Sequence, residues 1–332
     1  MQALVLTSHE AGLSYQTHPT PTLSHPEDVL IRLEAAALNH RDVWIRKGQY
    51  AGLKYPIVLG SDGTGVVTKI GGAVSKAWLG KSVLINPNTN WGENPAVQAK
   101  NYTILGLPND GTFAEYVLVR ADRLHLRPSF LSAEVAAALP LAGLTAFRAL
   151  FGRSKLQKSE KILINGIGGG VALMALQFAV AAGAKVYVSS SSEEKIAQAI
   201  ELGAIGGINY RTENWHKTLL KTHGEMNVIV DSAGGNGFAF LVDIAASGGR
   251  IVFYGGGEGA INNLNPQKIF WKQLAIFGST MGNDAEFEAM LRFVEIHQLQ
   301  PIIDSVFSLE NGKNAFDKLE HAAQFGKIIL KI

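Results

Sequence analysis

The chain has 332 residues, of which 47% are hydrophobic and 17% charged, and its formal net charge at pH 7 is +2. This composition is ordinary for a globular protein with a sizeable core, and the length favours two domains. A charge so close to neutral gives no support to nucleic acid or an anionic membrane as a partner. No run of about 18 apolar residues is present, and the N-terminal stretch lacks the features of a signal peptide. We therefore expect a cytoplasmic protein with no membrane or nucleic-acid partner.

The sequence contains no cysteine and nine histidines. The missing cysteines exclude disulfides, thiolate zinc sites and a cysteine nucleophile. No two histidines form an HxxxH or HExxH pair, the spacing that places two imidazoles on one helix face around a metal. Both observations argue against a catalytic zinc ion.

The N-terminal third of the chain predicts short strands, because apolar and polar residues alternate in several runs separated by prolines and glycines. This pattern predicts a compact antiparallel, barrel-like domain. From Ser132 the pattern changes, predicting a short helix over 133–139 and a second helix beginning near Thr145. The predicted strands cover residues 2–6, 29–33, 63–70, 82–86 and 113–119.

Residues 161–172, KILINGIGGGVA, predict the first half of a nucleotide-binding βαβ unit. A mostly apolar strand is followed by a glycine-rich turn from Gly166 to Gly170 and then by an apolar helix. Glycine suits such a turn because the backbone must approach a pyrophosphate closely, and the helix N-terminus offers free N–H groups to the phosphates. The next strand begins at Lys185, as this unit requires.

Strands and helices then alternate, which predicts a doubly wound parallel sheet. The last part of the chain predicts a helix over 284–297, a turn at Pro301, a helix from Leu309 and a closing strand over 327–332. These elements have no place in the six-stranded sheet, so we expect them to return to the first domain. The expected sheet strands are 161–165, 185–188, 207–209, 227–230, 250–254 and 274–277, and the expected domains are 1–125, 126–270 and the returning segment 271–332.

The end of the second sheet strand favours NADP(H) over NAD(H). A site for NAD usually places an acidic residue there for the ribose hydroxyls, and such a carboxylate would repel a 2′-phosphate. This chain instead has four serines at 189–192, with Lys195 one turn into the next helix. Tyr210 and Arg211 follow the third strand and add an aromatic face and a second cation. The alternative interpretation is a serine-rich turn that only caps the helix, since Ser191-Ser192-Glu193-Glu194 has the pattern of a capping box.

These stretches together resemble the medium-chain dehydrogenase/reductase superfamily, and within it the zinc-independent quinone oxidoreductase-like branch. The resemblance covers essentially the whole chain and implies an α/β fold, with a GroES-like catalytic domain and a Rossmann domain. The motifs that carry it are LNHRDVWIRKGQY (38–50), LGSDGTGVV (59–67), GTFAEYV (111–117), LPLAGLTAFRAL (139–150), NGIGGGVALMALQFA (165–179), ELGA then INY (201–210), VIVDSAGG (228–235), GGRIVFYG (248–255) and FGKIILKI (325–332).

The chain departs from zinc-dependent relatives at every metal position. Those enzymes carry a cysteine, a Gly-His-Glu triplet and a third ligand where this sequence has Asn39, Gly60-Ser61-Asp62 and Leu141. Residues 87–110 lie where such relatives keep four cysteines for a structural zinc, and here there are none. We therefore expect no metal.

The resemblance also implies cofactor contacts. Thr145, Lys327 and the segments 255–257 and 278–280 are expected near the nicotinamide, the glycine-rich turn along the pyrophosphate, and the serine-rich turn at the adenosine. The expected cofactor residues are Thr145, Gly166, Gly168, Gly169, Gly170, Val171, Ser189, Ser190, Lys195, Tyr210, Gly255, Ser279 and Lys327.

Without zinc, hydrogen-bond donors must stabilise the oxyanion that develops during hydride transfer, so acceptors that delocalise charge become the easier substrates. Asn39 and Tyr50 are the expected donors, with Asp62 and His40 as weaker candidates. Alternatively, Asn39 caps the following helix and Tyr50 packs in a loop, while Asp42 is expected to bind backbone N–H groups.

The sequence therefore predicts an NADPH-dependent reductase of quinones or α,β-unsaturated carbonyls. Two alternatives remain open: a secondary alcohol or ketone dehydrogenase, and an NADPH-binding sensor with little or no turnover, since a fold does not guarantee chemistry. Apolar segments at 251–254 and 269–277 suggest a homodimer joined through the Rossmann domains.

Overall fold

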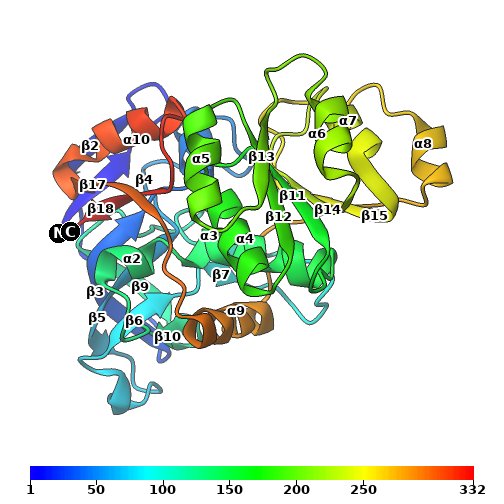
Figure 1. Ribbon diagram of the computed structural model, residues 1–332. Coiled ribbons are helices and arrows are strands. Elements are labelled where there is room, and N and C mark those ends of the chain that lie inside the picture. Colours follow the sequence, from blue (N-terminus) through cyan, green and yellow to red (C-terminus); the bar gives the residue numbers. More distant parts are fainter. The chain divides into compact units, whose positions relative to one another are not determined.

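The computed structural model describes residues 1–332 and divides into two compact units, Met1–Ala142 with Asn283–Ile332, and Gly143–Gly282 (Figure 1). Both boundaries between the units lie later in the sequence than expected, after residue 142 instead of 125 and after residue 282 instead of 270. Ala137 and Ala138 pack with Ala35 and Ala37 in one buried cluster, which keeps the stretch after residue 126 in the first unit. The last strand of the parallel sheet ends at Gly278, which keeps the stretch after residue 271 in the second.

The first unit is built on a mixed sheet with the strand order β10-β6-β5-β3-β18-β17, and β9 also pairs with β3. The long strand β3 joins the two halves of this sheet. It pairs antiparallel with β5 on one side and with β9 and then β18 on the other. A smaller sheet has the order β2-β1-β4, and β7 pairs with β8. The strands are β1 Gln2–Leu6, β2 Leu13–Thr17, β3 Asp28–Ala37, β4 Ile57–Val58, β5 Asp62–Ile70, β6 Ser82–Ile85, β7 Asn88–Thr89, β8 Thr103–Ile104, β9 Tyr116–Arg120 and β10 Leu124–Leu126.

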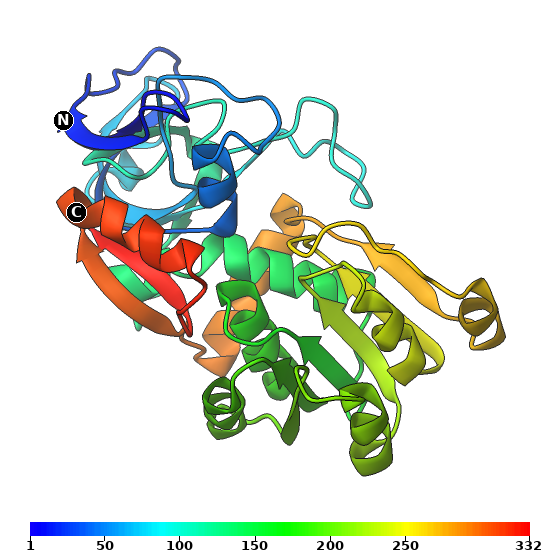
Figure 2. The ribbon, with the colours of Figure 1, turned by 90° about the horizontal axis from the view of Figure 1, so that it is seen from above.

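The C-terminal segment returns to the first unit, as expected. Strand β18 (Lys327–Lys331) pairs antiparallel with β3, and β17 (Ile303–Ser308) pairs parallel with β18. Both termini lie in this first unit, and Figures 1 and 2 show the N and C labels on the same side of it. The sequence did not predict β17, because this edge strand is only partly buried, its Val306 is 49% exposed, and it lacks a clear apolar alternation.

Helix α9 of the first unit begins at a capping box. Asn283 caps α9, and the carboxylate of Glu286 accepts a hydrogen bond from the backbone N–H of Asn283, which completes a capping box. The helices are α1 His40–Arg46, α2 Ala133–Ala137, α9 Asp284–His297 and α10 Gly312–Glu320, with 3₁₀ turns at Lys76–Trp78, Ala121–Arg123 and Leu309–Asn311.

The second unit is a six-stranded parallel sheet with the order β13-β12-β11-β14-β15-β16 (Figure 1). This order reverses direction at β11, so the predicted doubly wound Rossmann sheet is confirmed. The strands are β11 Lys161–Asn165, β12 Lys185–Ser190, β13 Gly206–Asn209, β14 Met226–Asp231, β15 Ala245–Phe253 and β16 Ala275–Gly278.

Helices cover both faces of this sheet. Apolar residues of α6 and α7 pack with Leu163 and Ile229 on one face, while the alternate residues Ile162 and Ile164 are buried on the other face. The predicted helix start near Thr145 is wrong, because α3 begins at Pro140, whose fixed φ suits the first helical position. The helices are α3 Pro140–Phe147, a π-helix Arg148–Arg153, α4 Gly170–Ala181, α5 Glu193–Glu201, α6 Trp215–His223, α7 Phe238–Ile244 and α8 Pro266–Trp271. None of the helices is both long and apolar enough to cross a membrane.

Candidate active site

A closed network of buried polar groups surrounds Asp62, the first residue of β5. The Lys327 ammonium donates to Asp62 Oδ2 at 3.0 Å, to Asn39 Oδ1 at 2.6 Å and to the backbone oxygen of Leu38 at 2.7 Å. The Asn39 amide donates to the same Asp62 Oδ2 at 2.9 Å, and the Leu141 N–H donates to Oδ1 at 2.8 Å. Asn39, Asp62 and Lys327 are all buried. The network therefore joins β3, β5, β18 and the start of α3 within the first unit.

Two sequence predictions need correction here. Asp62 is inaccessible to solvent, and its two carboxylate oxygens accept three N–H donors, so it has no path to a substrate. Lys327 donates all three of its N–H bonds inside the unit, so none is left for a nicotinamide. Both residues position Asn39.

Asp42 has the structural role that the sequence indicated. Its Oδ2 accepts the backbone N–H of Asn39, the residue that caps α1, at 2.8 Å. Its Oδ1 is buried without a hydrogen-bond partner. Complete burial raises the pKa of Asp42 to about 6, although the charges of Arg41 and Lys327 and the bond from Asn39 lower it in part.

The residues at the expected metal positions do not fit a zinc ion. Asn39 offers an amide oxygen that already accepts from an ammonium, Ser61 a hydroxyl and Leu141 no donor atom, whereas zinc prefers thiolate, imidazole and carboxylate. The Lys327 cation also lies among the oxygens of Leu38, Asn39 and Asp62 and would repel a second cation. No group of three or more His, Cys, Asp or Glu residues is placed to hold a metal.

His40 lies within reach of the charge of Lys327, and the Tyr50 ring lies next to the Arg41 guanidinium. The Tyr50 ring is half-buried against the core cluster of the first unit, and its hydroxyl has no hydrogen bond in the chain. The His40 ring reaches solvent, yet partial desolvation by the surrounding protein and the charge of Lys327 lower the pKa of His40. His40 is therefore neutral at pH 7 and carries one N–H.

Arg41 is a residue that the sequence analysis did not single out. Its side chain is buried, and its Nη1 donates to Ser61 Oγ at 2.7 Å and to the backbone oxygen of Leu105 at 3.0 Å. The guanidinium carbon lies 5.2 Å from the centre of the Tyr50 ring. The sequence did not indicate that Arg41 is buried, because apolar and polar residues are mixed in the motif around it, residues 38–50.

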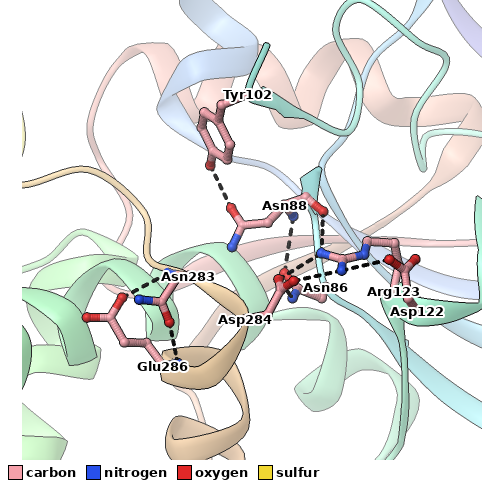
Figure 3. Close-up of polar contacts among 8 residues, drawn as sticks. All are labelled: Asn86, Asn88, Tyr102, Asp122, Arg123, Asn283, Asp284 and Glu286. Atoms are coloured by element: carbon pink, nitrogen blue, oxygen red, sulfur yellow. Dashed lines mark hydrogen bonds and ion pairs between the residues drawn. The ribbon is translucent and has the colours of Figure 1, made fainter. Parts of the chain in front are cut away.

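The segment after β6 is held by side-chain hydrogen bonds (Figure 3). Arg123 donates from Nη1 and Nη2 to the two carboxylate oxygens of Asp284 at 2.7 and 2.8 Å, and from Nη1 to the backbone oxygen of Asn88. The Tyr102 hydroxyl donates to Asn88 Oδ1 at 2.6 Å, and the Tyr102 ring meets Trp91 edge-on at 5.3 Å. The start of α9 and both ends of this segment are thereby tied together.

The glycine-rich turn of the second unit fits a dinucleotide phosphate. Gly166 and Gly168 have φ of 79° and 132°, a region that favours glycine. Gly169 caps α4, and a Cβ built at Gly169 would point into open space. The N–H groups of the first turn of α4 have no acceptor within the helix, so together with the helix dipole they can bind an anion. Gly170 and Val171 begin this helix.

The two serines that end β12 have hydrogen-bond partners within the chain. Ser189 is fully buried, donates to Asn165 Oδ1 at 2.5 Å and accepts the Gly166 N–H at 3.1 Å. It therefore holds the turn and cannot reach a 2′-phosphate. Ser190 is also buried, and its hydroxyl accepts the Ser192 N–H. The expected phosphate contact of Ser189 is therefore corrected to a structural role, whereas Ser190 keeps its O–H and its phosphate contact stays a prediction.

Asn165, at the end of β11, was missed by the sequence analysis. Besides accepting from Ser189, it donates to Asp231 Oδ1 at 2.7 Å, and Asp231 Oδ2 accepts the Gly234 N–H at 2.8 Å. These bonds cross β12, β11 and β14 at their carboxyl ends, which is the ligand-binding edge of an open parallel sheet. The sequence did carry one indication of this role, because Asn165 is a polar residue at the end of an otherwise apolar strand.

The remaining cofactor residues lie at this edge or beside it. Tyr210 follows β13 and is 41% exposed, and Lys195 is half-buried on α5. Ser279 follows β16, and its hydroxyl is buried without a hydrogen-bond partner, which suits a polar ligand group. A Cβ at Gly255 would lie 2.5 Å from the Ser232 carbonyl oxygen, so only glycine fits there. Thr145 lies buried on α3, with its hydroxyl near Met281.

Sequence comparison identifies the class of protein. The family profile "Alcohol dehydrogenase GroES-like domain" matches residues 25–129, and "Zinc-binding dehydrogenase" matches residues 170–295. The zinc-type alcohol dehydrogenase-like protein YogA of Leptosphaeria maculans is 36% identical over 330 residues, which cover 92% of this chain and 91% of that protein. A solved structure described as NAD-dependent alcohol dehydrogenase is 36% identical, with a TM-score of 0.93 and complete coverage of both chains. The chain therefore belongs to the medium-chain dehydrogenase/reductase superfamily.

Within that superfamily the protein is an oxidoreductase, because its relatives are oxidoreductases over their whole length. The acryloyl-coenzyme A reductase of Sulfurisphaera tokodaii is 28% identical over 341 residues and covers all of both chains. The quinone oxidoreductase of Homo sapiens is 27% identical over 317 residues, which cover 92% of this chain and 90% of that protein. The GroES-like family profile and the match to the solved alcohol dehydrogenase structure confirm the predicted GroES-like and Rossmann domains.

Proposed function

We propose that this protein is a zinc-independent, NADPH-dependent reductase that transfers hydride to a quinone or an α,β-unsaturated carbonyl. The observation that carries the proposal is the Lys327–Asn39–Asp62 network. It fills the expected metal position with an ammonium and its three acceptors. A chain with this arrangement must stabilise negative charge with hydrogen-bond donors and cations of its own.

Such donors favour particular acceptors. A simple ketone concentrates the developing charge on one oxygen, for which a metal ion is the strongest stabiliser. An enone or a quinone spreads the charge over several atoms, so weaker donors are sufficient. The names of the Sulfurisphaera tokodaii and Homo sapiens relatives, acryloyl-coenzyme A reductase and quinone oxidoreductase, point to acceptors of these two kinds.

Asn39 and Tyr50 are the proposed donors. Asn39 uses one amide N–H for Asp62, and its second N–H is free for the acceptor oxygen. Its orientation is fixed because Lys327 donates to the amide oxygen, so the amide cannot flip without placing NH₂ against an ammonium. Tyr50 has a hydroxyl without a protein partner and can donate to the same oxygen or protonate it.

NADP(H) is the proposed cofactor, and when bound it supplies the hydride. The glycine-rich turn offers its pyrophosphate site, and Ser279 offers a buried hydroxyl for a polar group of the nicotinamide. The preference for the 2′-phosphate now depends on Ser190, Lys195, Tyr210 and Arg211, because the Ser189 hydroxyl is engaged elsewhere. No acidic residue occupies positions 189–192.

We also propose a homodimer joined through the parallel sheets. The expected contact at 251–254 needs correction, because β15 is an inner strand and Ile251 and Val252 are fully buried. Strand β16 is the sheet edge and can pair with its own copy by two-fold symmetry. Phe270 and Trp271, just before it, are 60% and 78% exposed, and their burial would favour association.

The test of the reductase proposal is oxidation of NADPH and NADH with a 1,2-quinone and with a neutral enone, after treatment with a chelator. We expect NADPH-linked turnover that survives the chelator, and Asn39→Ala and Tyr50→Phe to lower kcat by about 10- to 100-fold each. Tight NADPH binding without turnover of any acceptor would instead support a sensor. Turnover lost on chelation and restored by zinc would contradict the metal-free assignment.

A second candidate is a secondary alcohol or ketone dehydrogenase. It is favoured by the structure described as NAD-dependent alcohol dehydrogenase, which is 36% identical over the whole chain. Faster reduction of NAD⁺ with secondary alcohols than oxidation of NADPH with enones would support it.

A further inference from the structure

Arg41 carries a buried positive charge without an anion in contact. Its side chain is 9% exposed, and both of its hydrogen bonds go to neutral oxygens, those of Ser61 and Leu105. Its Nε is buried without a partner, and its Nη2 donates no hydrogen bond within the chain. Three N–H bonds of this guanidinium therefore remain unused.

The nearby carboxylates form no ion pair with Arg41, although its charge acts on Asp42 and lowers the pKa of that carboxyl against the effect of burial. Both oxygens of Asp62 accept from Asn39, Lys327 and Leu141. One oxygen of Asp42 accepts from the backbone of Asn39, and neither forms an ion pair with Arg41.

Arginine cannot lose its proton in a protein. Burying its charge costs several kcal/mol unless an anion compensates. The arrangement is therefore one that a bound anion would complete.

The position of Arg41 connects it to the reacting centre proposed above. It lies in α1 between Asn39 and Asp42, and its Nη1 holds Ser61, the neighbour of Asp62. The Tyr50 ring lies 5.2 Å from its guanidinium carbon. A group bound to Arg41 is thus next to Tyr50, one of the two proposed donors, and near Ser61, which precedes Asp62.

We propose that Arg41 binds a carboxylate of the hydride acceptor, so that the substrates are enones or quinones that also carry a carboxylate group. This inference rests on the proposed reductase function and adds the substrate class. A carboxylate matches the site because a planar guanidinium donates to its two oxygens. A single arginine balances a monoanion, whereas a phosphate dianion would leave one charge uncompensated.

The test compares an acid with its neutral analogue. Wild-type protein is assayed with NADPH and either 4-oxopent-2-enoate or the methyl ester of the same acid, which share the reacting enone. We expect a KM about 10- to 100-fold lower for the acid, because a charge-assisted hydrogen bond distinguishes the two. Arg41→Lys and Arg41→Met should reduce this ratio to below about 3-fold. Arg46→Lys, on the same helix with partners on α10, is the control and should keep the full ratio.

Binding of 4-oxopentanoate, measured by calorimetry in the presence of NADP⁺, gives a readout that needs no turnover. It should bind wild-type protein at least about 10-fold more tightly than Arg41→Lys. Equal KM values for acid and ester in wild-type protein would overturn the carboxylate site while leaving the reductase proposal intact. Arg41-dependent binding of 4-oxopentanoate without turnover of any acceptor would support the site and contradict the reductase. An acid-to-ester ratio that Arg41→Lys retains would also overturn the site, and if Arg41→Met does not fold, Arg41→Lys and the wild-type protein decide.

Discussion

The Lys327 ammonium donates a 2.6 Å hydrogen bond to the side-chain oxygen of Asn39, a residue 288 positions away in the sequence. This bond connects the last strand of the chain to the first residue of the proposed active site. It fixes which face of the amide carries oxygen, so that the free N–H of Asn39 points to one side only. The C-terminal return of the chain to the first unit is therefore part of the active-site construction.

Replacing Lys327 with Met should destabilise the first unit strongly. The change leaves the Asp62 carboxylate fully buried without its cation, and breaking such a pair costs about 3–5 kcal/mol. Urea denaturation measures the free energy of unfolding. Lys331→Met is the control, because Lys331 lies on the same strand, is 68% exposed and lies 3.8 Å from its partner carboxylate on Glu134; it should change stability by less than about 0.5 kcal/mol. Equal effects of the two variants would show that the buried network contributes little.

The Asp42 carboxyl should make stability depend on pH. Its pKa is raised from 3.8 to about 6 by burial, so the folded state binds the proton more tightly than the unfolded state. The protonated Asp42 carboxyl therefore contributes its full stabilisation below about pH 4. This stabilisation is lost as the pH rises through about 6, which lowers the free energy of unfolding by about 3 kcal/mol for a shift of this size.

Asp42→Asn isolates this effect, because the amide oxygen can still accept the Asn39 N–H but the side chain carries no charge. The stability of the variant relative to wild-type protein should therefore rise between pH 4.5 and pH 8. The difference is the quantity to measure, since histidines with a lowered pKa, such as His125, titrate in the same range. Glu93→Gln, an exposed carboxylate, should show no such rise. A constant difference for Asp42→Asn would mean that the carboxyl is ionised at little cost.

Local sequence patterns predicted most of the fold. The strand over 161–165 and the helix over 284–297 match β11 and α9 residue for residue, because each combines a continuous apolar pattern with a turn or cap at its start. Strand β17 was missed because it is a half-exposed edge whose position is set by pairing with β18. Local pattern contains no information on such a partner.

The candidate site was predictable only in part. Asn39 was found because a motif placed it at a ligand position, but its partners Asp62 and Lys327 lie far away in the sequence. Ser189 looked available for a phosphate, although Asn165 on the neighbouring strand holds its hydroxyl. In each case the chemistry of the side chain was readable and its hydrogen-bond partner was not.

The Arg123–Asp284 pair should anchor the start of α9. Arg123 donates to both oxygens of Asp284, and the contacts with Asp284 and Asp122 raise the pKa of Arg123 further despite its desolvation. Lysine cannot reproduce the two parallel bonds, so Arg123→Lys should lower the free energy of unfolding by about 1–2 kcal/mol. It should also speed amide hydrogen exchange in the first turn of α9. Arg292→Lys, an exposed pair with Glu288 on the same helix, is the control and should change neither quantity measurably.

Lys195 should determine the choice between NADPH and NADH. It is the cation nearest in sequence to the serine-rich turn, and with the Ser189 hydroxyl engaged elsewhere the 2′-phosphate has fewer neutral donors to bind. Lys195→Met should raise the Kd for NADPH by about 10-fold, the loss expected for one charge-assisted contact, and leave the Kd for NADH nearly unchanged. The effect should shrink as the salt concentration rises, because the contact is near the surface.

Fluorescence titration with both cofactors measures this selectivity directly. Lys185→Met is the matched control, since Lys185 is an exposed residue at the opposite end of β12 and should alter neither affinity. Equal weakening of both cofactors by Lys195→Met would place the side chain at the pyrophosphate instead. Tighter binding of NADH than of NADPH by the wild-type protein would contradict the NADP(H) assignment. The serine-rich turn at 189–192 would then have no role in choosing the cofactor and would only cap α5.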